Sequence, residues 1–427
     1  MYDLLIKGGR VIDPAEGTDR KADLAIDKGV VAKIRRKIDQ KARRTLDASG
    51  CLVCPGLIDV HVHCREPGHE EEETIASCAA AAAAGGFATL CAMPNTDPPM
   101  DNDIAIRQVL LRGSEAGGAR VLPVGSVTTG RKGQQLAEMA LMQRAGAVAF
   151  TDDGNGVASS SVFHRALQYA RMLGVPLMQH CQDPELMTGV MNSGPVAVRL
   201  GLGGIAASGE EIMLRRDLEL VKRTSARYHV QHVSSAGSVE LIRAARAAGL
   251  AVTGEATPHH LLLTDAACMT YDPNYKMNPP LRSADDVQAL RAGVADGTLT
   301  VLATDHAPHS KEEKEQEFAL APFGIISLEC ALGLYAKALL QSGWMDWPQL
   351  IARMTAGPAE LLGREELGHL KPGQARDVTV IDPKADWTVD VDRFESRSRN
   401  CPYHGWTLPA RAVATIVDGQ IRHDATA

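Results

Sequence analysis

Aromatic side chains, excess positive charge and long apolar runs are all scarce in this sequence of 427 residues. Aromatics make up 4% of the chain, while Ala and Gly are plentiful, which favours helices packed on strands over platforms of stacked rings. The net charge of -7 argues against a nucleic-acid-binding protein, and a small anionic substrate would need a local basic pocket. No uninterrupted apolar stretch reaches the ~18 residues that a membrane-spanning helix needs.

Paired cysteines and an N-terminal leader are missing as well. Nine cysteines are spread singly, mostly in apolar segments, which predicts free buried thiols in a reducing compartment. Cys51 and Cys54 form a CxxC motif, but no second pair follows, so a structural zinc site is not expected. The first residues lack a basic stretch followed by an apolar one. We therefore expect a cytoplasmic protein with no membrane segment.

Both ends of the chain have the pattern of β-structure. Short strand-like runs lie at 3–6, 10–12, 22–26 and 30–34, with turns expected at Gly8-Gly9 and Lys28-Gly29. The far end shows strands at 377–381 and 412–417 with a tight hairpin signal at Asp418-Gly419. Because chain ends tend to lie close together, we expect one small β-sandwich domain built from residues 1–54 and 361–427. Two separate β appendages are the alternative.

The middle of the chain, residues 55–360, has a different pattern of apolar and polar residues. Apolar strand-like runs recur, and each is followed by a segment with helical propensity. The eight runs are 57–63, 88–93, 121–127, 148–151, 176–180, 228–233, 251–255 and 299–304. Eight repeats of strand and helix are typical of the α/β fold called the (β/α)8 or TIM barrel. Residues 182–226 exceed one helix and predict an additional element.

Polar residues gather where these strands end. Side chains two apart in a strand share a face, so His61, His63 and Arg65 point to one side. One His-x-His pair fits a core position as well as a metal site. Other strand ends carry Asn95, Asp152-Asp153, His180, His232, His259-His260, Asp305-His306 and His309. Active sites of TIM barrels lie at the carboxyl ends of the strands, and His with Asp suits two adjacent zinc-like ions that share a carboxylate.

Seven short segments carry a family resemblance. They are HVHCREPG (61–68), MPNT (93–96), FTDDG (150–154), QHC (179–181), QHVS (231–234), NPPLR (278–282) and ATDHAPH (303–309). Together they resemble the class I bacterial dihydroorotases of the amidohydrolase superfamily, and the likeness runs over essentially the whole chain. His-x-His alone is shared across that superfamily, whereas the combination of HVHCREPG with FTDDG and ATDHAPH is specific.

The resemblance implies a set of metal ligands and one or two zinc ions. His61, His63 and Asp305 would hold one ion, His180 and His232 the second, and Asp153 would bridge the two. Hydantoinases and allantoinases usually bridge with a carboxylated lysine, and FTDDG contains no lysine. Asp152 is the rival bridge, although a turn or cap role is expected for it. His259, His260 and His306 match no ligand position and are expected to support the site.

The resemblance also implies the substrate contacts. Arg65, Asn95 and His309 match the residues that hold the substrate's free carboxylate, and His63 also belongs to the expected substrate set. Asn278 matches a ring contact, and the segment Pro322-Phe323-Gly324 matches the backbone that reads the ring's amide edge. The implied reaction is the reversible cyclisation of N-carbamoyl-L-aspartate to L-dihydroorotate and water in pyrimidine (UMP) biosynthesis. Asp305 would carry the proton between water and the ring nitrogen.

Two other functions and several details stay open. Another cyclic amidase, such as a hydantoinase, dihydropyrimidinase or allantoinase, would share the fold, although Arg65, Asn95 and His309 argue against it. A non-catalytic scaffold of aspartate transcarbamoylase is a further alternative, although the chain keeps every ligand. The resemblance leads us to expect a homodimer and possible binding of aspartate transcarbamoylase. Cys181 is either a buried thiol or a ligand in a resting form, and residues 310–322 are a candidate mobile cover.

Overall fold

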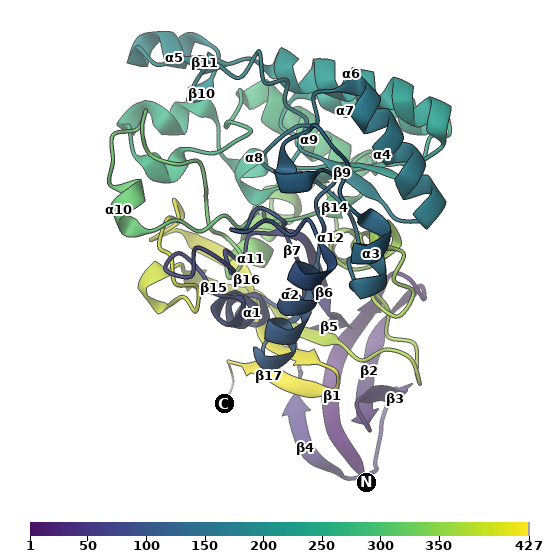
Figure 1. Ribbon diagram of the computed structural model, residues 1–427. Helices are drawn as coiled ribbons and strands as arrows, with labels where there is room; N and C mark the ends of the chain where they lie inside the picture. The colour runs from purple at the N-terminus through teal and green to yellow at the C-terminus, as the bar shows by residue number, and fades with distance from the viewer. Residues whose placement is uncertain (426–427) are drawn as a thin grey trace.

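Strands from both ends of the chain share one sheet in the computed structural model, which describes residues 1–425 (Figure 1). The sheet has the order β17-β16-β15-β5-β1-β2-β3, and β4 pairs with β1. The two ends are joined where β5 runs antiparallel to β15, with Val53 opposite Val380. Its strands are β1 (Tyr2–Asp13), β2 (Thr18–Asp27), β3 (Val30–Arg35), β4 (Ala42–Asp47), β5 (Leu52–Pro55), β15 (Val378–Thr388), β16 (Thr407–Val417) and β17 (Gln420–Asp424).

The turns of this sheet were predicted with one error. Lys28-Gly29 connects β2 to β3, and Asp418-Gly419 connects β16 to β17 with positive φ at both residues, as a two-residue hairpin favours. Gly8-Gly9 is not a turn, because β1 continues through it with a shift of register. Gly8 has a φ of 75°, and its N–H donates to Asp23 Oδ1 at 2.9 Å. The two glycines therefore form a bulge, which the same residue types also permit.

Parallel strands make up the middle of the chain. The first group is β6 (Leu57–Val62), β7 (Phe87–Ala92) and β8 (Arg120–Pro123), in that order. The second group has the order β14-β13-β12-β9, with β9 (Leu177–Gln179), β12 (Tyr228–Val230), β13 (Val252–Ala256) and β14 (Val301–Leu302). Phe150 forms isolated bridges with Gly125 and Leu177, and Val62 forms one with His306. Seven predicted runs thus contain a strand, and run 148–151 contributes only a bridge.

Helices follow these strands as the periodicity predicted. Those that cover the parallel strands are α1 (Ile75–Ala84), α2 (Asp103–Glu115), α3 (Met139–Ala145), α4 (Ser160–Leu173), α6 (Ala207–Thr224), α7 (Ala236–Ala247), α9 (Ala284–Asp296), α12 (Trp347–Met354) and α13 (Ala356–Leu362). After β14, the helix α11 (Ala331–Tyr335) continues into one π-helical turn at Ala336–Leu340. The predicted additional element consists of β10 (Met191–Asn192), α5 (Pro195–Leu200) and β11 (Gly204–Ile205).

A single residue, Gly56, separates the terminal sheet from the parallel strands. It lies between the end of β5 at Pro55 and the start of β6 at Leu57. A Cβ atom at this position would come within 2.4 Å of the Ala88 Cβ and 2.7 Å of the Asp377 Cβ. Only glycine fits so close an approach, so the strand that ends in His61 and His63 is held directly against the terminal sheet.

The core is apolar and free of disulfides. One large cluster of buried side chains joins the parallel strands to the helices, and it includes Leu57, Leu90, Phe150, Leu177 and Tyr228. All nine cysteines carry free thiols, and eight of them are buried, as predicted. Within residues 1–425, no helix combines the length and apolar character that a membrane crossing requires.

Candidate metal and substrate site

Two histidines at the end of β6 meet two aspartates from distant strand ends. Alternation along the strand turns His61 and His63 to the same side, away from Val60 and Val62. The Nε2 atom of His61 lies 3.3 Å from Asp153 Oδ1 and 3.4 Å from Asp305 Oδ1. The Nε2 atom of His63 lies 3.0 Å from Asp305 Oδ1 and 3.5 Å from Asp153 Oδ2. Four residues from three separate segments therefore aim their polar atoms at one point.

His180 and His232 complete this cluster from the ends of β9 and β12. The Nε2 atom of His232 lies 3.5 Å from Asp153 Oδ1 and 2.7 Å from His180 Nδ1. His180 Nδ1 lies 3.8 Å from the same Asp153 oxygen. Asp153 is thus the carboxylate that faces all four imidazoles. Two groups of three in this cluster, His61 with His63 and Asp305, and His61 with Asp153 and His232, bring their ligand atoms within 4.8 Å of one another.

The polar atoms of this cluster fit a divalent cation. His61 Nε2 and Asp153 Oδ1 are buried and have no hydrogen-bond partner among residues 1–425. Leaving such an atom unsatisfied costs about 1–3 kcal/mol, which a bound cation would offset. Burial would raise the pKa of Asp153, but the imidazoles of His61, His232 and His63 outweigh it and hold that pKa well below the usual range. Imidazole nitrogens and carboxylate oxygens are a ligand set for zinc and related ions.

A cavity of about 350 Å³ opens beside the cluster and contains most of the predicted substrate residues. Arg65 lines it and donates from Nε to the Pro308 carbonyl at 2.9 Å, while Nη2 lies 3.2 Å from His309 Nε2. Asn95 Oδ1 lies 2.8 Å from His63 Nδ1. The predicted residues Arg65, Asn95 and His309 therefore line one cavity next to the candidate metal ligands.

The residues expected to read the ring lie near His180 in the case of Asn278, and next to His309 in the case of Phe323 and Gly324. Asn278 exchanges hydrogen bonds with Gln182, and Gln182 Oε1 lies 2.7 Å from His180 Nε2. Phe323 lines the cavity, with its carbonyl 2.9 Å from His309 Nε2. The Gly324 N–H donates to the Lys276 carbonyl at 2.9 Å. The backbone groups of Phe323 and Gly324 are thus engaged within the protein, and their substrate contacts stay a prediction.

Glu255 is a functional candidate that was not predicted from the sequence. It is fully buried in β13, where Oε1 lies 2.5 Å from His61 Nδ1 and accepts the His232 backbone N–H at 3.0 Å. Its second oxygen lies 2.9 Å from His229 Nε2. Burial would raise the pKa of Glu255, but the imidazoles of His61 and His229 lower it far below the usual range. A carboxylate that orients a ligand histidine in this way increases metal affinity.

We expect Glu255→Gln to weaken metal binding about 10- to 100-fold, because His61 loses the carboxylate that fixes its tautomer and orientation. Competition with a chromophoric chelator measures this affinity. Glu329→Gln is the matched control, since Glu329 is also a mostly buried carboxylate and accepts the N–H groups of Glu395 and Ser396 away from the cluster. Equal affinities in the two variants would remove Glu255 from this role.

Glu72 is a second carboxylate that sequence reasoning did not single out. Its Oε2 atom lies 2.9 Å from Arg65 Nε and 3.7 Å from His309 Nδ1. Burial, reinforced by neighbouring acidic groups, raises the pKa of Glu72 to about 7. Glu72 and the Pro308 carbonyl both contact Nε of Arg65, whose side chain lines the cavity. A run of four glutamates after REPG gave no sign of which one would contact Arg65.

The remaining predicted residues have structural contacts. Asp152 accepts the N–H groups of Val127 and Thr128 at 2.9 and 3.0 Å, which is the turn role expected for it. His260 Nε2 bonds the Pro279 carbonyl, and His306 Nε2 lies 3.5 Å from Glu73. Neither belongs to the metal cluster within residues 1–425.

Of the two roles considered for Cys181, the structure supports the buried thiol. Its sulfur lies 3.2 Å from the Tyr228 hydroxyl, and burial raises the pKa of the thiol well above its usual value. None of the converging ligand groups in the described part of the chain includes Cys181. The hypothesis that this thiol occupies a metal position therefore has no support in the geometry.

The segment expected as a cover lies beside the cavity. It contains the short helix α10 (Lys311–Lys314), which begins at a Ser310 cap. Lys314 Nζ donates to the carbonyls of Pro322 and Gly324 at 3.0 Å each. The cover is thus fastened to the cavity wall at Pro322, and its mobility stays a prediction.

Comparisons with known proteins find similarity along essentially the whole chain. A family model described as dihydro-orotase-like matches residues 50–238. The dihydroorotase of Pelotomaculum thermopropionicum is 49% identical over 98% of both chains, and that of Anaeromyxobacter dehalogenans is 48% identical over 99% of this chain and 98% of its own. Among solved structures, an L-hydantoinase (dihydropyrimidinase) from Arthrobacter aurescens has a TM-score of 0.88 at 26% identity, covering 99% of this chain and 96% of its own. This chain belongs to the dihydroorotase family.

Proposed function

We propose that this protein interconverts N-carbamoyl-L-aspartate and L-dihydroorotate in pyrimidine biosynthesis, releasing water when the ring closes. Whole-length similarity to dihydroorotases supports the assignment. One structural observation carries it furthest, namely that Arg65, Asn95 and His309 line the same cavity as the metal ligands. A cyclic amide that also bears a carboxylate needs both features, because the ring and its charged group must be held together.

The proposed metal site uses the six clustered side chains. His61, His63 and Asp305 would hold one ion, His180 and His232 the other, and Asp153 would bridge them, with zinc as the expected metal. When bound, such ions lower the pKa of a water molecule and polarise the substrate carbonyl. The unsatisfied His61 Nε2 and Asp153 Oδ1 support this arrangement.

Asp305 is proposed to carry the proton. In ring opening, water adds to the ring carbonyl carbon, the carbon–nitrogen bond breaks, and the proton from water moves through the Asp305 carboxylate to the departing nitrogen. Burial would raise the pKa of Asp305, but the charges of His61, His63 and His232 outweigh burial and lower it. The carboxylate is therefore ionised near neutral pH and ready to accept a proton. Ring closure follows the same steps in reverse.

Substrate orientation is proposed to come from the cavity walls. The free edge of the Arg65 guanidinium can donate two parallel hydrogen bonds to the substrate carboxylate, helped by Asn95 and His309. His63 forms a hydrogen bond with Asn95, so it also lies close to the proposed position of the substrate carboxylate. Asn278 and the backbone of Phe323 and Gly324 would contact the ring.

The strand pairings support a closed (β/α)8 barrel, which we propose as the architecture of residues 55–360. The bridges of Phe150 connect β8 to β9, and the bridge between Val62 and His306 connects the end of β6 to the segment after β14. We further propose that residues 1–54 and 361–427 form one β-sandwich domain. A homodimer and association with aspartate transcarbamoylase stay predictions of the family resemblance.

A hydantoinase is the second candidate, because the structural likeness to the Arthrobacter aurescens L-hydantoinase extends over the whole chain. Purified protein assayed with dihydroorotate, hydantoin and allantoin separates the two, with metal content measured on the same sample. We expect dihydroorotate to be opened fastest by a wide margin. Faster turnover of hydantoin or allantoin would reject the proposal, and a protein without metal or turnover would be a scaffold.

A further inference from the structure

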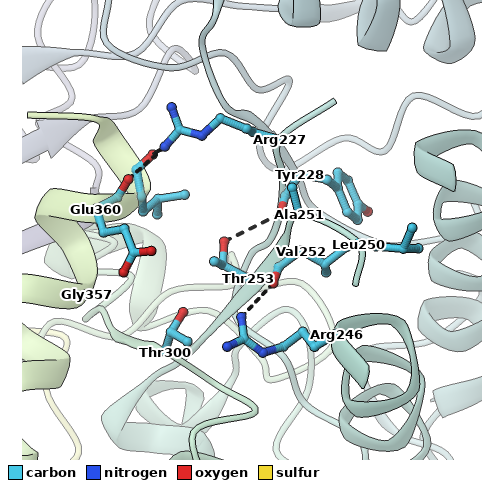
Figure 2. A pocket seen from close by; sticks show the side chains of 11 residues that line it. Arg227, Tyr228, Arg246, Leu250, Ala251, Val252, Thr253, Thr300, Gly357 and Glu360 are labelled. Carbon is cyan, nitrogen blue, oxygen red and sulfur yellow. Dashed lines mark hydrogen bonds between the residues drawn. The ribbon is translucent and has the colours of Figure 1, made fainter. Parts of the chain in front are cut away.

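A second cavity lies at the opposite ends of the strands that carry the metal ligands. It has a volume of about 210 Å³ and opens where β12, β13 and β14 begin. Figure 2 shows Arg227 and Arg246 on two sides of it, with Thr253 between them and Thr300 nearby. Leu250 and Leu361 add apolar surface. Nothing in the proposed reaction uses this cavity.

The polar groups of the cavity are held in place and retain donor capacity. Arg227 Nη2 donates to the carbonyls of Glu360 and Leu361 at the end of α13, at 2.7 and 2.5 Å. Arg246 donates only from Nη1, to the Val252 carbonyl at 2.8 Å, so its Nε and Nη2 are free among the described residues. The Thr300 hydroxyl oxygen is buried and has no hydrogen-bond partner within residues 1–425.

The charge of the lining favours an anion although the whole chain is acidic. Arg227 and Arg246 face one carboxylate, that of the exposed Glu360, which leaves an excess of one positive charge. Fixed guanidinium groups are the side chains best suited to phosphate.

We propose that this cavity is a second ligand site, which binds a small phosphate monoester. Donors at Arg246, Thr300 and Thr253 approach from different directions, which suits a tetrahedral phosphate better than a planar carboxylate. The cavity is larger than a phosphate group, and the apolar surface of Leu250 and Leu361 can hold an organic substituent.

A chain of hydrogen bonds leads from this cavity to the metal cluster. The Thr253 hydroxyl lies 2.8 Å from His229 Nδ1, His229 Nε2 lies 2.9 Å from Glu255 Oε2, and Glu255 Oε1 lies 2.5 Å from His61 Nδ1. The Thr253 hydroxyl also donates to the Tyr228 carbonyl at 3.5 Å, and a bound phosphate would compete for the same proton and so disturb the contact with His229. The imidazole must then reorient against Glu255, which also holds His61. Occupancy of the cavity therefore alters turnover.

Binding is tested by calorimetric titration of inorganic phosphate into the metal-loaded protein, with dihydroorotate and N-carbamoyl-L-aspartate present at saturation to fill the first cavity. We expect one site, weakened about tenfold or more in Arg246→Gln through loss of charge-assisted hydrogen bonds. Arg243→Gln is the matched control, because Arg243 lies one turn earlier on α7 and pairs with Glu240 and Asp296 outside the cavity. Absent binding, or equal binding by both variants, would overturn the site. This arm does not depend on which cyclic amide is the substrate.

The hydrogen-bonded connection between this cavity and the metal cluster is tested with Thr253→Val, which keeps the shape of the side chain and removes its hydroxyl. We expect saturating phosphate to change kcat of the unmodified protein by roughly twofold or more. In Thr253→Val, phosphate should still bind to the cavity but leave kcat unchanged. A kcat that phosphate changes equally in both proteins, or in neither, would contradict the hydrogen-bonded route.

Discussion

Asp305→Asn is expected to lower kcat for dihydroorotate by ~10³–10⁴-fold, because an amide cannot accept the proton that must move from water to the ring nitrogen. Metal content is expected to stay nearly intact. Five other side chains of the cluster remain, and an asparagine oxygen can still face the ion. The measurement is steady-state turnover at several pH values together with metal analysis of the same protein.

Asp13→Asn is the control for this variant, since Asp13 is a buried aspartate of the terminal sheet and bonds the N–H groups of Ala15 and Leu370. Its turnover per mole of folded protein should match that of the unmodified chain. If Asp305→Asn also turns over at a near-normal rate, Asp305 is not the proton carrier. If its metal is lost, the reduced kcat reports ligation instead.

Arg65→Lys is expected to raise KM for dihydroorotate about 10- to 100-fold with a smaller change in kcat, because one point donor replaces a bidentate fork. The buried Glu72 strengthens this expectation. It holds Arg65 through Nε, and a lysine drawn toward Glu72 would leave no second donor for the substrate carboxylate. Initial rates over a range of substrate concentrations separate KM from kcat.

Arg112→Lys provides the comparison for Arg65→Lys. Arg112 donates from Nε to Glu66 Oε1 at 2.8 Å, and Glu66 directly follows Arg65 in the sequence. The side chain of Arg112, however, does not line the cavity. We expect its KM to be unchanged. An unchanged KM in Arg65→Lys as well would mean that the substrate carboxylate is bound elsewhere.

Much of the site could be predicted because many of its residues lie in short sequence patterns at the ends of predicted strands. The two-residue spacing of His61 and His63 fixes their common face, and parallel strands bring their carboxyl ends together whatever the loops between them contain. His180, His232 and Asp305 each follow an apolar run directly. The same rule located the metal cluster, although it could not show that His61 belongs to both groups of three ligands.

Other features depend on contacts that no local pattern records. Glu255 stands at the end of an apolar run, where a carboxylate that merely begins a loop would also stand. Only the packing of the strands shows that it lies between His61 and His229. Glu72 is one of four consecutive glutamates, two of which are buried, and only its contacts with Arg65 and His309 distinguish it. Gly8-Gly9 permits either a turn or a bulge, and pairing with β2 decides for the bulge. The cavity at the start of β12 and β13 joins residues far apart in the chain.

The single-residue link at Gly56 bears on how the protein unfolds. Local unfolding usually releases segments that are joined by slack connections, and this junction has none. The amides of β5 in the terminal sheet and of β6 before the metal ligands should therefore exchange with solvent deuterium together, as one cooperative unit. Loss of β15, the C-terminal strand that pairs with β5, would accordingly release His61 and His63, so metal retention reports on the integrity of a sheet that contributes no ligand.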